Sequence, residues 1–181
     1  MKFEVYIYEG DLTSEKLRES LTMDAVGSYC AKRGINCQDM SIVRTEKGKP
    51  YVCGASEDVY FNVSHTGNMW MCIVGAAECG IDIQAVKDCK YEQLSRRHFT
   101  KDEQRYIDNY GIGGFFRLWV RREAFGKYTG EGFYGKKPAL VDEEGWLIDE
   151  VGDGFLKDVP IADDIVCAFC TGGEDDEIVF A

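Results

Sequence analysis

The stretch from Val59 to Val86 restricts the fold more than any other part of the sequence. It reads as a strand that breaks at Ser-His-Thr-Gly and continues as further strands around a turn at Glu78–Gly80. No linker rich in proline, glycine or serine divides the chain around this stretch. The sequence therefore predicts two lobes that meet near residues 70–85 and pack as one rigid unit.

The residues before this stretch predict a strand, a helix and a short hairpin. Residues 2–9 alternate polar and apolar side chains, as a half-buried strand does. Apolar residues at helical spacing follow, with Thr13 or Ser14 as the N-cap and Gly34 as the stop signal. Residues 41–52 read as two short strands around a Gly-Lys-Pro turn.

The residues after it are rich in helix first and return to strands later. Residues 91–127 predict three helices, and a capping box follows the first break. The last fifty residues read as strands joined by acidic turns. Each half is therefore expected to be α+β, with a mostly antiparallel sheet and packed helices. We place the boundary between lobes 1–75 and 76–181.

The composition predicts a globular protein with reduced cysteines. Of 181 residues, 45% are hydrophobic and 13% aromatic, enough to bury a core. The chain is too long and too aromatic for a disulfide-stapled mini-domain, so its eight cysteines are expected to be core thiols, including the lone C-x-x-C pair Cys167 and Cys170. No apolar run is long enough to span a membrane and no signal peptide precedes the first strand, so we expect a cytoplasmic protein without a membrane partner.

The charge distribution favours some partners over others. A net charge of −11 argues against general nucleic-acid binding. Residues 96–137 nevertheless hold ten basic and five acidic residues and so carry a charge of +5. An anionic substrate or an acidic partner would need such a segment. A solvated helix face is the alternative, which the charge alone favours.

Two turns carry groups that suit a phosphate. Lys49 lies in the Gly-Lys-Pro triplet and can contact a phosphate as a point charge, although most such triplets are only turns. Ser64 and His65 lie at a strand end just before Gly67, where a hydroxyl, an imidazole and backbone N–H groups suit a phosphate ester. A hydrolase in which His65 activates Ser64 is a poor interpretation, because adjacent side chains of a strand point apart.

Two further pairs carry carboxylates. Asp82 and Gln84 share one face of a strand, and their hard oxygen donors suit Mg²⁺. A turn-bound aspartate beside an edge glutamine is the alternative, which these two residues alone favour. Glu123 and Lys127 stand one helical turn apart, on one face. They form either a stabilising surface pair, or a metal-binding carboxylate or base beside a cation that meets a phosphate.

Taken in order, these features resemble the 4′-phosphopantetheinyl transferase superfamily, in particular its long branch typified by the activating enzyme of surfactin synthetase. The family pattern is G-K-P, F-N-x-S-H-[ST]-G, G-[IV]-D-[IV]-E and W-x-x-K-E-A-x-x-K. The similar segments here are Gly48–Pro50, Phe61–Gly67, Gly80–Gln84 and Trp119–Lys127. The resemblance covers roughly residues 45–130.

The resemblance implies a fold and a reaction. The fold would be two similar lobes related by a pseudo-twofold axis, with the active site in the cleft between them, and hence a monomer. The reaction would transfer the 4′-phosphopantetheine arm of coenzyme A to a serine of an acidic acyl or peptidyl carrier protein, leaving adenosine 3′,5′-bisphosphate. The arginines Arg96, Arg97 and Arg105 of the basic segment would then steer that partner.

The resemblance also implies roles for individual residues. Asp82 and Glu123 would hold Mg²⁺, with Gln84 in the place of the middle ligand, and Glu123 would also be the candidate base. The coenzyme A phosphates would contact four side chains: Lys49, Ser64, His65 and Lys127. Lys127 would in addition bind the pyrophosphate or protonate the leaving group.

Two departures from the pattern bear on activity. Gln84 replaces the usual glutamate, which predicts a higher Mg²⁺ requirement that Mn²⁺ can relieve. Arg122 stands where the family has a lysine. Two alternatives remain open: another Mg²⁺-dependent phosphoryl or pyrophosphate chemistry, and a degenerate relative that binds coenzyme A or a carrier protein without turnover. The sequence leaves open which carrier is served and which residues hold the adenine and the 3′-phosphate.

Overall fold

The computed structural model describes residues 1–181 and is an α+β structure, as the sequence predicts. Three helices are present: α1 (Glu15–Arg33), α2 (Tyr91–His98) and α3 (Lys101–Thr129). The ten strands are β1 (Lys2–Glu9), β2 (Ser41–Arg44), β3 (Pro50–Cys53), β4 (Tyr60–Thr66), β5 (Met69–Gly75), β6 (Gly80–Ala85), β7 (Glu150–Val151), β8 (Gly154–Asp158), β9 (Ile165–Thr171) and β10 (Glu177–Phe180).

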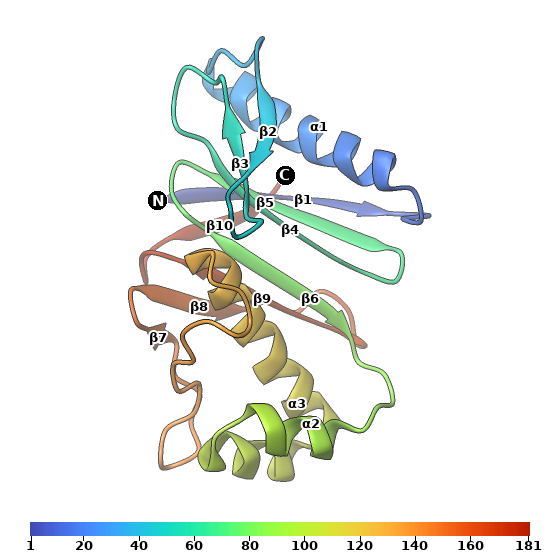
Figure 1. Ribbon diagram of the computed structural model, residues 1–181, viewed down its shortest axis with the longest axis vertical. Helices are drawn as coiled ribbons and strands as arrows, with labels where there is room; N and C mark the ends of the chain where they lie inside the picture. Colours follow the sequence, from blue (N-terminus) through green and yellow to red (C-terminus); the bar gives the residue numbers. More distant parts are fainter.

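The first sheet has the strand order β10-β1-β5-β4 and carries α1 (Figure 1). Strands β1, β5 and β4 pair antiparallel, as expected, whereas β10 pairs parallel with β1. The predicted caps of α1 are confirmed. Ser14 accepts a hydrogen bond from the Leu17 N–H, and Gly34 ends the helix in the left-handed conformation at φ 69°. Buried residues of α1 then pack on the sheet around Phe61 and Trp70.

Strands β2 and β3 form a separate two-stranded hairpin, here called the β2–β3 hairpin. Its turn closes through mutual backbone bonds: the Thr45 N–H donates to Lys49 O at 2.9 Å, and the Gly48 N–H donates to Thr45 O. Gly48 has φ 86°, a conformation that favours glycine. The predicted turn therefore exists, and it presents Lys49 at the end of the hairpin.

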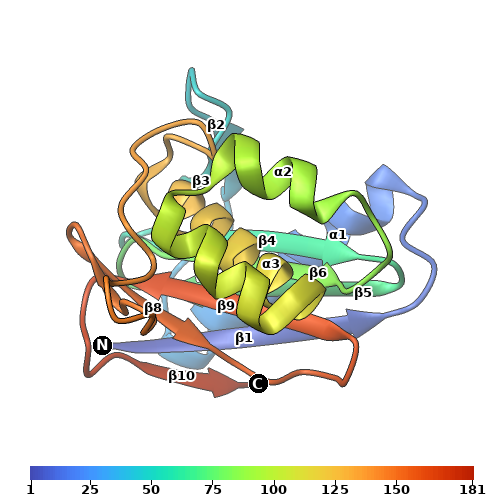
Figure 2. The same ribbon diagram turned by 90° about the horizontal axis from the view of Figure 1, so that it is seen from below.

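The second sheet has the order β6-β9-β8-β7 and is antiparallel throughout. Figure 2 shows α3 lying across it, and α3 packs on β6 and β9. The capping box at the start of α3 is present, with Thr100 and Glu103 bonding each other's backbone N–H. The two helices expected on either side of Gly111 form this one element, in which Gly111 alone has non-helical angles (φ 62°, ψ −147°).

Two details differ from the sequence-based expectation. Strand β4 does not break at Ser-His-Thr-Gly but continues through Thr66, and the turn is formed by the next two residues, Gly67 (φ 55°) and Asn68. The C-terminal strand β10 joins the first sheet rather than the second. The boundary between lobes at residues 75 and 76 stays a prediction.

A row of side-chain hydrogen bonds joins the two sheets along β4 and β6, here called the β4–β6 seam. Asn62 Oδ1, Ser64 Oγ and Thr66 Oγ1 accept from the backbone N–H groups of Ile81, Ile83 and Ala85, at 3.1, 3.2 and 3.1 Å. Alternate residues of a strand share one face, so three side chains in a row reach the same neighbour. Partners are always 19 residues apart, so the two strands run in the same direction.

Gly80 opens β6 where this strand crosses α3. A Cβ at this position would overlap the carbonyl oxygen of Ala124 and lie 2.6 Å from the backbone nitrogen of Tyr128. Backbone therefore rests directly on backbone at the start of β6.

All eight cysteines are free, and five are buried: Cys30, Cys72, Cys79, Cys167 and Cys170. The core interpretation is wrong for Cys53, which lies exposed at the end of β3, and Cys37 and Cys89 are only half-buried. Each of the three helices is too short or too polar to cross a membrane.

We predict that Asn62→Ala weakens the β4–β6 seam. The change leaves the buried Ile81 N–H without a partner, which costs about 1–3 kcal/mol in the free energy of unfolding. Urea denaturation measures this loss. Asn109→Ala, which changes an exposed side chain of α3, is the control and should stay within about 0.5 kcal/mol of the parent. Equal stability of the two variants would show that the seam bond is dispensable.

Candidate functional site

Asp82 lies in the third position of β6 with only 3% of its surface exposed. Its Oδ1 accepts hydrogen bonds from Ser64 Oγ at 2.8 Å and from Lys127 Nζ at 2.7 Å. Its Oδ2 has a single long contact, 3.5 Å from Nε2 of Gln84. One carboxylate oxygen is thus held by the protein, while the other keeps the capacity to accept a further donor or a cation.

Lys127 connects the end of α3 to both strands of the seam. Besides Asp82, its Nζ donates to the carbonyl oxygen of Ile81 on β6 at 2.9 Å and to that of Val63 on β4 at 3.5 Å. Three acceptors from two strands therefore fix the ammonium. The structure thus pairs Lys127 with Asp82, a contact that the sequence does not predict.

Glu123 stands one helical turn before Lys127 and is partly buried. Its carboxylate has no hydrogen-bond or ion-pair partner in the protein. Burial raises the pKa of Glu123, the nearby negative charge of Asp82 raises it further, and Lys127 acts in the opposite direction. Asp82 thus pairs with the ammonium, whereas Glu123 is affected by the charges of both residues without bonding to either.

This arrangement fits a hard divalent cation. The oxygen donors are Asp82 Oδ2, the Glu123 carboxylate and the amide oxygen of Gln84, a set that suits Mg²⁺ rather than a thiophilic metal. The protein has no group of three or more His, Cys, Asp and Glu residues able to hold a metal ion. Oxygens of a ligand or of water would have to complete the coordination. A bound cation would relieve the excess negative charge at Glu123.

A cavity of about 280 Å³ adjoins this cluster. Four of its lining residues are cations: Arg44, Lys47, Lys49 and Lys127. The other lining residues are small or neutral: Gly48, Pro50, Asn62, Val63, Gly126, Gly130 and Gly132. The walls come from the β2–β3 hairpin, from β4 and from the end of α3. A cavity with four cations and no acidic lining residue suits a ligand with several negative charges.

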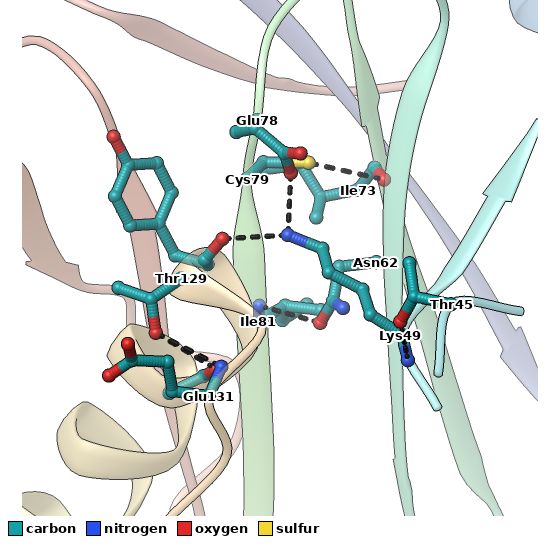
Figure 3. A network of polar contacts seen from close by, with 11 residues as sticks. Thr45, Lys49, Asn62, Ile73, Glu78, Cys79, Ile81, Thr129 and Glu131 are labelled. Carbon is teal, nitrogen blue, oxygen red and sulfur yellow. Dashed lines mark hydrogen bonds and ion pairs between the residues drawn. The ribbon is translucent and has the colours of Figure 1, made fainter. Parts of the chain in front are cut away.

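Lys49 lines this cavity, but its ammonium already has two partners. Nζ donates to Glu78 Oε2 at 2.5 Å and to the carbonyl oxygen of Tyr128 at 2.6 Å. Figure 3 shows the side chain reaching from the hairpin toward Glu78, which precedes β6. Its stem passes over Gly130, where a Cβ would lie 3.2 Å from Lys49 Cδ. The lysine therefore ties the hairpin to the second half of the chain.

The Ser64 and His65 side chains lie apart, as expected for neighbours in a strand. Ser64 is buried, donates to Asp82 and accepts from Ile83, so the structure places its hydroxyl in the seam. His65 is exposed and has no hydrogen bond. Sequence reasoning missed Arg44 and Lys47. Their signal was the density of basic residues around the Gly-Lys-Pro turn, of which only Lys49 was selected.

Arg122 does not belong to the cluster, although it precedes Glu123. It is 2% exposed and pairs with the fully buried Glu103 at 2.6 Å. It also donates to the carbonyl oxygen of His98, which ends α2, and lies over the ring of Phe99. This residue therefore joins α2 to α3, and its charge is neutralised inside the protein.

The basic segment divides into paired and unpaired residues. Five members have acidic partners in the structure: Arg105, Arg117, Arg121, Arg122 and Lys127. The other five have none and are exposed: Arg96, Arg97, Lys101, Lys136 and Lys137. The solvated-face interpretation thus holds for part of the segment, and an exposed basic surface remains on α2 and the residues after α3.

Comparison with known proteins agrees with this geometry. A family model described as the 4′-phosphopantetheinyl transferase superfamily matches residues 78–147. A 4′-phosphopantetheinyl transferase of Bacillus subtilis is 27% identical over 153 residues, which cover 78% of this chain and 67% of that relative. The Sfp 4′-phosphopantetheinyl transferase of Bacillus subtilis strain 168 is 32% identical over 100 residues, which cover 52% and 43%. The gsp enzyme of Aneurinibacillus migulanus is 30% identical over 95 residues, which cover 50% and 38%.

The chain is therefore similar to 4′-phosphopantetheinyl transferases over this range. The matched range includes four of the predicted site residues: Asp82, Gln84, Glu123 and Lys127. Lys49, Ser64 and His65 precede it. The chain spans between 38% and 67% of the length of these three transferase relatives.

We predict that Glu123→Gln stabilises the metal-free protein at alkaline pH. When folding raises the pKa of a carboxyl group, ionisation of that group destabilises the folded protein. The loss grows as the pH rises from the ordinary pKa of 4.5 through the pKa in the folded state. The amide removes this cost, so its advantage in melting temperature should be present at pH 8 and vanish as the pH falls toward 4.5.

Thermal unfolding across this pH range makes the measurement. Glu144→Gln, at an exposed turn, is the control and should show no such trend. A lower melting temperature for Glu123→Gln at pH 8 would contradict the crowding of the two carboxylates. Added Mg²⁺ should raise the melting temperature of the parent more than that of Glu123→Gln.

Proposed function

We propose that this protein is a Mg²⁺-dependent transferase that moves the 4′-phosphopantetheine arm of coenzyme A to a serine of an acyl or peptidyl carrier protein. The observation that supports this most is the meeting of Asp82, Glu123 and Lys127 beside a cavity lined by four cations. The named relatives are 4′-phosphopantetheinyl transferases, but the chain spans only part of their length. The activity of the whole protein is therefore part of the proposal.

The reaction makes and breaks one bond at phosphorus. The carrier's serine oxygen bonds to the phosphorus that bears the pantetheine arm, and the bond from that phosphorus to the bridging oxygen breaks. Adenosine 3′,5′-bisphosphate leaves with the electron pair. Glu123 accepts the serine proton, directly or through a water. Lys127 donates to the pyrophosphate oxygens, on which negative charge builds.

Asp82 and Glu123 would hold the Mg²⁺, with Gln84 beside them, and the ion would supply positive charge at the pyrophosphate. Ser64 supports this arrangement from behind, because its hydroxyl fixes one oxygen of Asp82. In this proposal Arg44, Lys47 and Lys49 meet the remaining phosphates of coenzyme A. To contact a phosphate, the Ser64 hydroxyl would have to give up its hydrogen bond to Asp82. Both ring nitrogens of His65, in contrast, have no hydrogen-bond partner in the protein.

The exposed basic surface would face the acidic carrier protein. Arg96 and Arg97 on α2 and Lys137 after α3 are exposed and unpaired. Tyr134, with 78% of its surface exposed, packs against His98 and has Lys137 near its ring. An exposed aromatic ring among cations suits an acidic partner with an apolar contact surface.

Three broader expectations belong to the same proposal. The pseudo-twofold relation of the lobes and an active site in the cleft between them are supported by two four-stranded sheets joined along one seam. Monomeric action follows if one chain supplies both halves of the site. The expected cytoplasmic location stays a prediction.

Transfer can be tested directly by mass spectrometry. The protein is incubated with apo-carrier protein, coenzyme A and Mg²⁺, and the carrier should gain the mass of one phosphopantetheine group. Asp82→Ala and Glu123→Ala should abolish the gain, because each removes a carboxylate of the cluster, and coenzyme A binding by calorimetry shows whether the cavity survives. Asn109→Ala, a change at an exposed residue of α3 outside the cluster, is the control for folding through its melting temperature.

The outcomes separate the candidate functions. No mass gain with fatty acid, polyketide and peptide carriers, while coenzyme A still binds, would identify a relative that binds without turnover. Gln84 favours this second candidate, because the cluster has one carboxylate fewer than the family pattern. A protein that neither binds coenzyme A nor transfers the arm would contradict the proposal as a whole. Another Mg²⁺-dependent phosphoryl chemistry would then remain as the candidate.

We predict that Gln84→Glu lowers the Mg²⁺ concentration needed for half-maximal transfer. The new carboxylate lies within reach of Asp82 and adds a negative charge to the proposed site. Titration of activity with Mg²⁺ and Mn²⁺ makes the measurement. Gln93→Glu on exposed α2 adds the same charge at a distance and serves as control. An unchanged metal dependence would show that residue 84 lies away from the metal.

A further inference from the structure

Glu78 pairs with the ammonium group of Lys49, a residue that lines the basic cavity although Glu78 itself does not. Its Oε2 lies 2.5 Å from Lys49 Nζ, and this is its only bond in the protein (Figure 3). The Lys49 side chain is only 14% exposed, whereas that of Glu78 is 50% exposed. The carboxylate is therefore in contact with water, and the ammonium is not free.

Two of the three lysines that line the cavity, Lys49 and Lys127, are held in different ways. Lys127 pairs with Asp82, which is buried and fixed by a second bond from Ser64. Lys49 pairs with Glu78, which precedes the start of β6 and has no second bond. Asp82 cannot leave its lysine without losing a buried bond, whereas Glu78 can rotate into solvent, where water replaces the lysine.

Lys49 keeps its place when Glu78 leaves. Its ammonium has three donors, and one of them binds the carbonyl oxygen of Tyr128 at 2.6 Å. This carbonyl lies at the C-terminal end of α3, which is the negative end of the helix dipole. The stem remains packed over Gly130. One contact therefore positions the ammonium, and the donors that face Glu78 can pass to another anion.

We propose that Glu78 is an internal competitor of the phosphate that Lys49 binds. In the free protein the carboxylate neutralises Lys49, and a phosphate-bearing ligand displaces it. Glu78 thus sets the affinity for the ligand and takes no part in the bond changes. This inference rests on the proposed use of the cavity for the phosphates of coenzyme A.

Removing the competitor should tighten binding. An exposed ion pair is worth about 0.2–1 kcal/mol, so Glu78→Gln should lower the Kd for coenzyme A by about 1.4- to fivefold. Glu46→Gln removes the same charge from the turn of the β2–β3 hairpin, where Glu46 is exposed and contacts no cation, and is the matched control. Isothermal titration with coenzyme A and with inorganic pyrophosphate measures both.

A double-mutant cycle isolates the Glu78–Lys49 contact. Lys49→Met should weaken binding, and Glu78→Gln should bring no gain when Lys49 is already Met. In the transfer reaction the effect of Glu78→Gln should appear as a lower KM for coenzyme A rather than a change in kcat. Melting temperatures of all variants confirm that they are folded.

Three results would overturn the role of Glu78. Weaker ligand binding by Glu78→Gln would show that the Glu78–Lys49 pair only holds the hairpin. A gain in affinity that persists in the Lys49→Met background, or that equals the gain of Glu46→Gln, would show a general charge effect. Failure of the parent protein to bind coenzyme A or pyrophosphate would instead overturn the proposed use of the cavity. Parent transfer with no change in Glu78→Gln would overturn this inference alone.

Discussion

The β4–β6 seam is the interaction on which the rest of the structure depends. Three side chains of β4 accept hydrogen bonds from backbone N–H groups of β6. In an ordinary sheet, backbone carbonyl oxygens would be the acceptors. Ser64 does more than this, because it also donates to Asp82. The bond that joins the sheets and the bond that orients the buried carboxylate therefore share one oxygen atom, and the candidate site is as rigid as the seam.

Local signals explain how much of the fold could be predicted from the sequence. The caps of α1, the capping box of α3 and the hairpin turn at Gly48 are set by residues within a few positions of each other, and all were recognised. The parallel pairing of β10 with β1 was not, because it joins residues some 175 positions apart. The β4–β6 seam could not be predicted for a related reason. A polar side chain in a strand carries no local signal of which backbone N–H group it will accept from.

The same distinction applies to the candidate site. Only the resemblance to a family grouped Asp82, Glu123 and Lys127 into one predicted site. The structure pairs Asp82 with Lys127 and leaves Glu123 near their charges, and the shared role of the three stays a prediction. Ion-pair partners could not be read from any pattern. Glu78 was seen only as part of a turn, and Arg122 was compared with a lysine of the family pattern although its partner is the buried Glu103.

The missing side chain at Gly80 has a consequence for the spacing of the cluster. Because β6 touches α3 through backbone atoms alone, the separation between the strand that bears Asp82 and the helix that bears Glu123 is the shortest that two main chains permit. Even one methyl group at position 80 would clash with the backbone of α3 at Ala124 and Tyr128. It would push α3 outward beside Ala124, and both Glu123 and Lys127 would move with the helix. Gly80, which has no side chain, thus sets the distance between β6 and α3 at the candidate site.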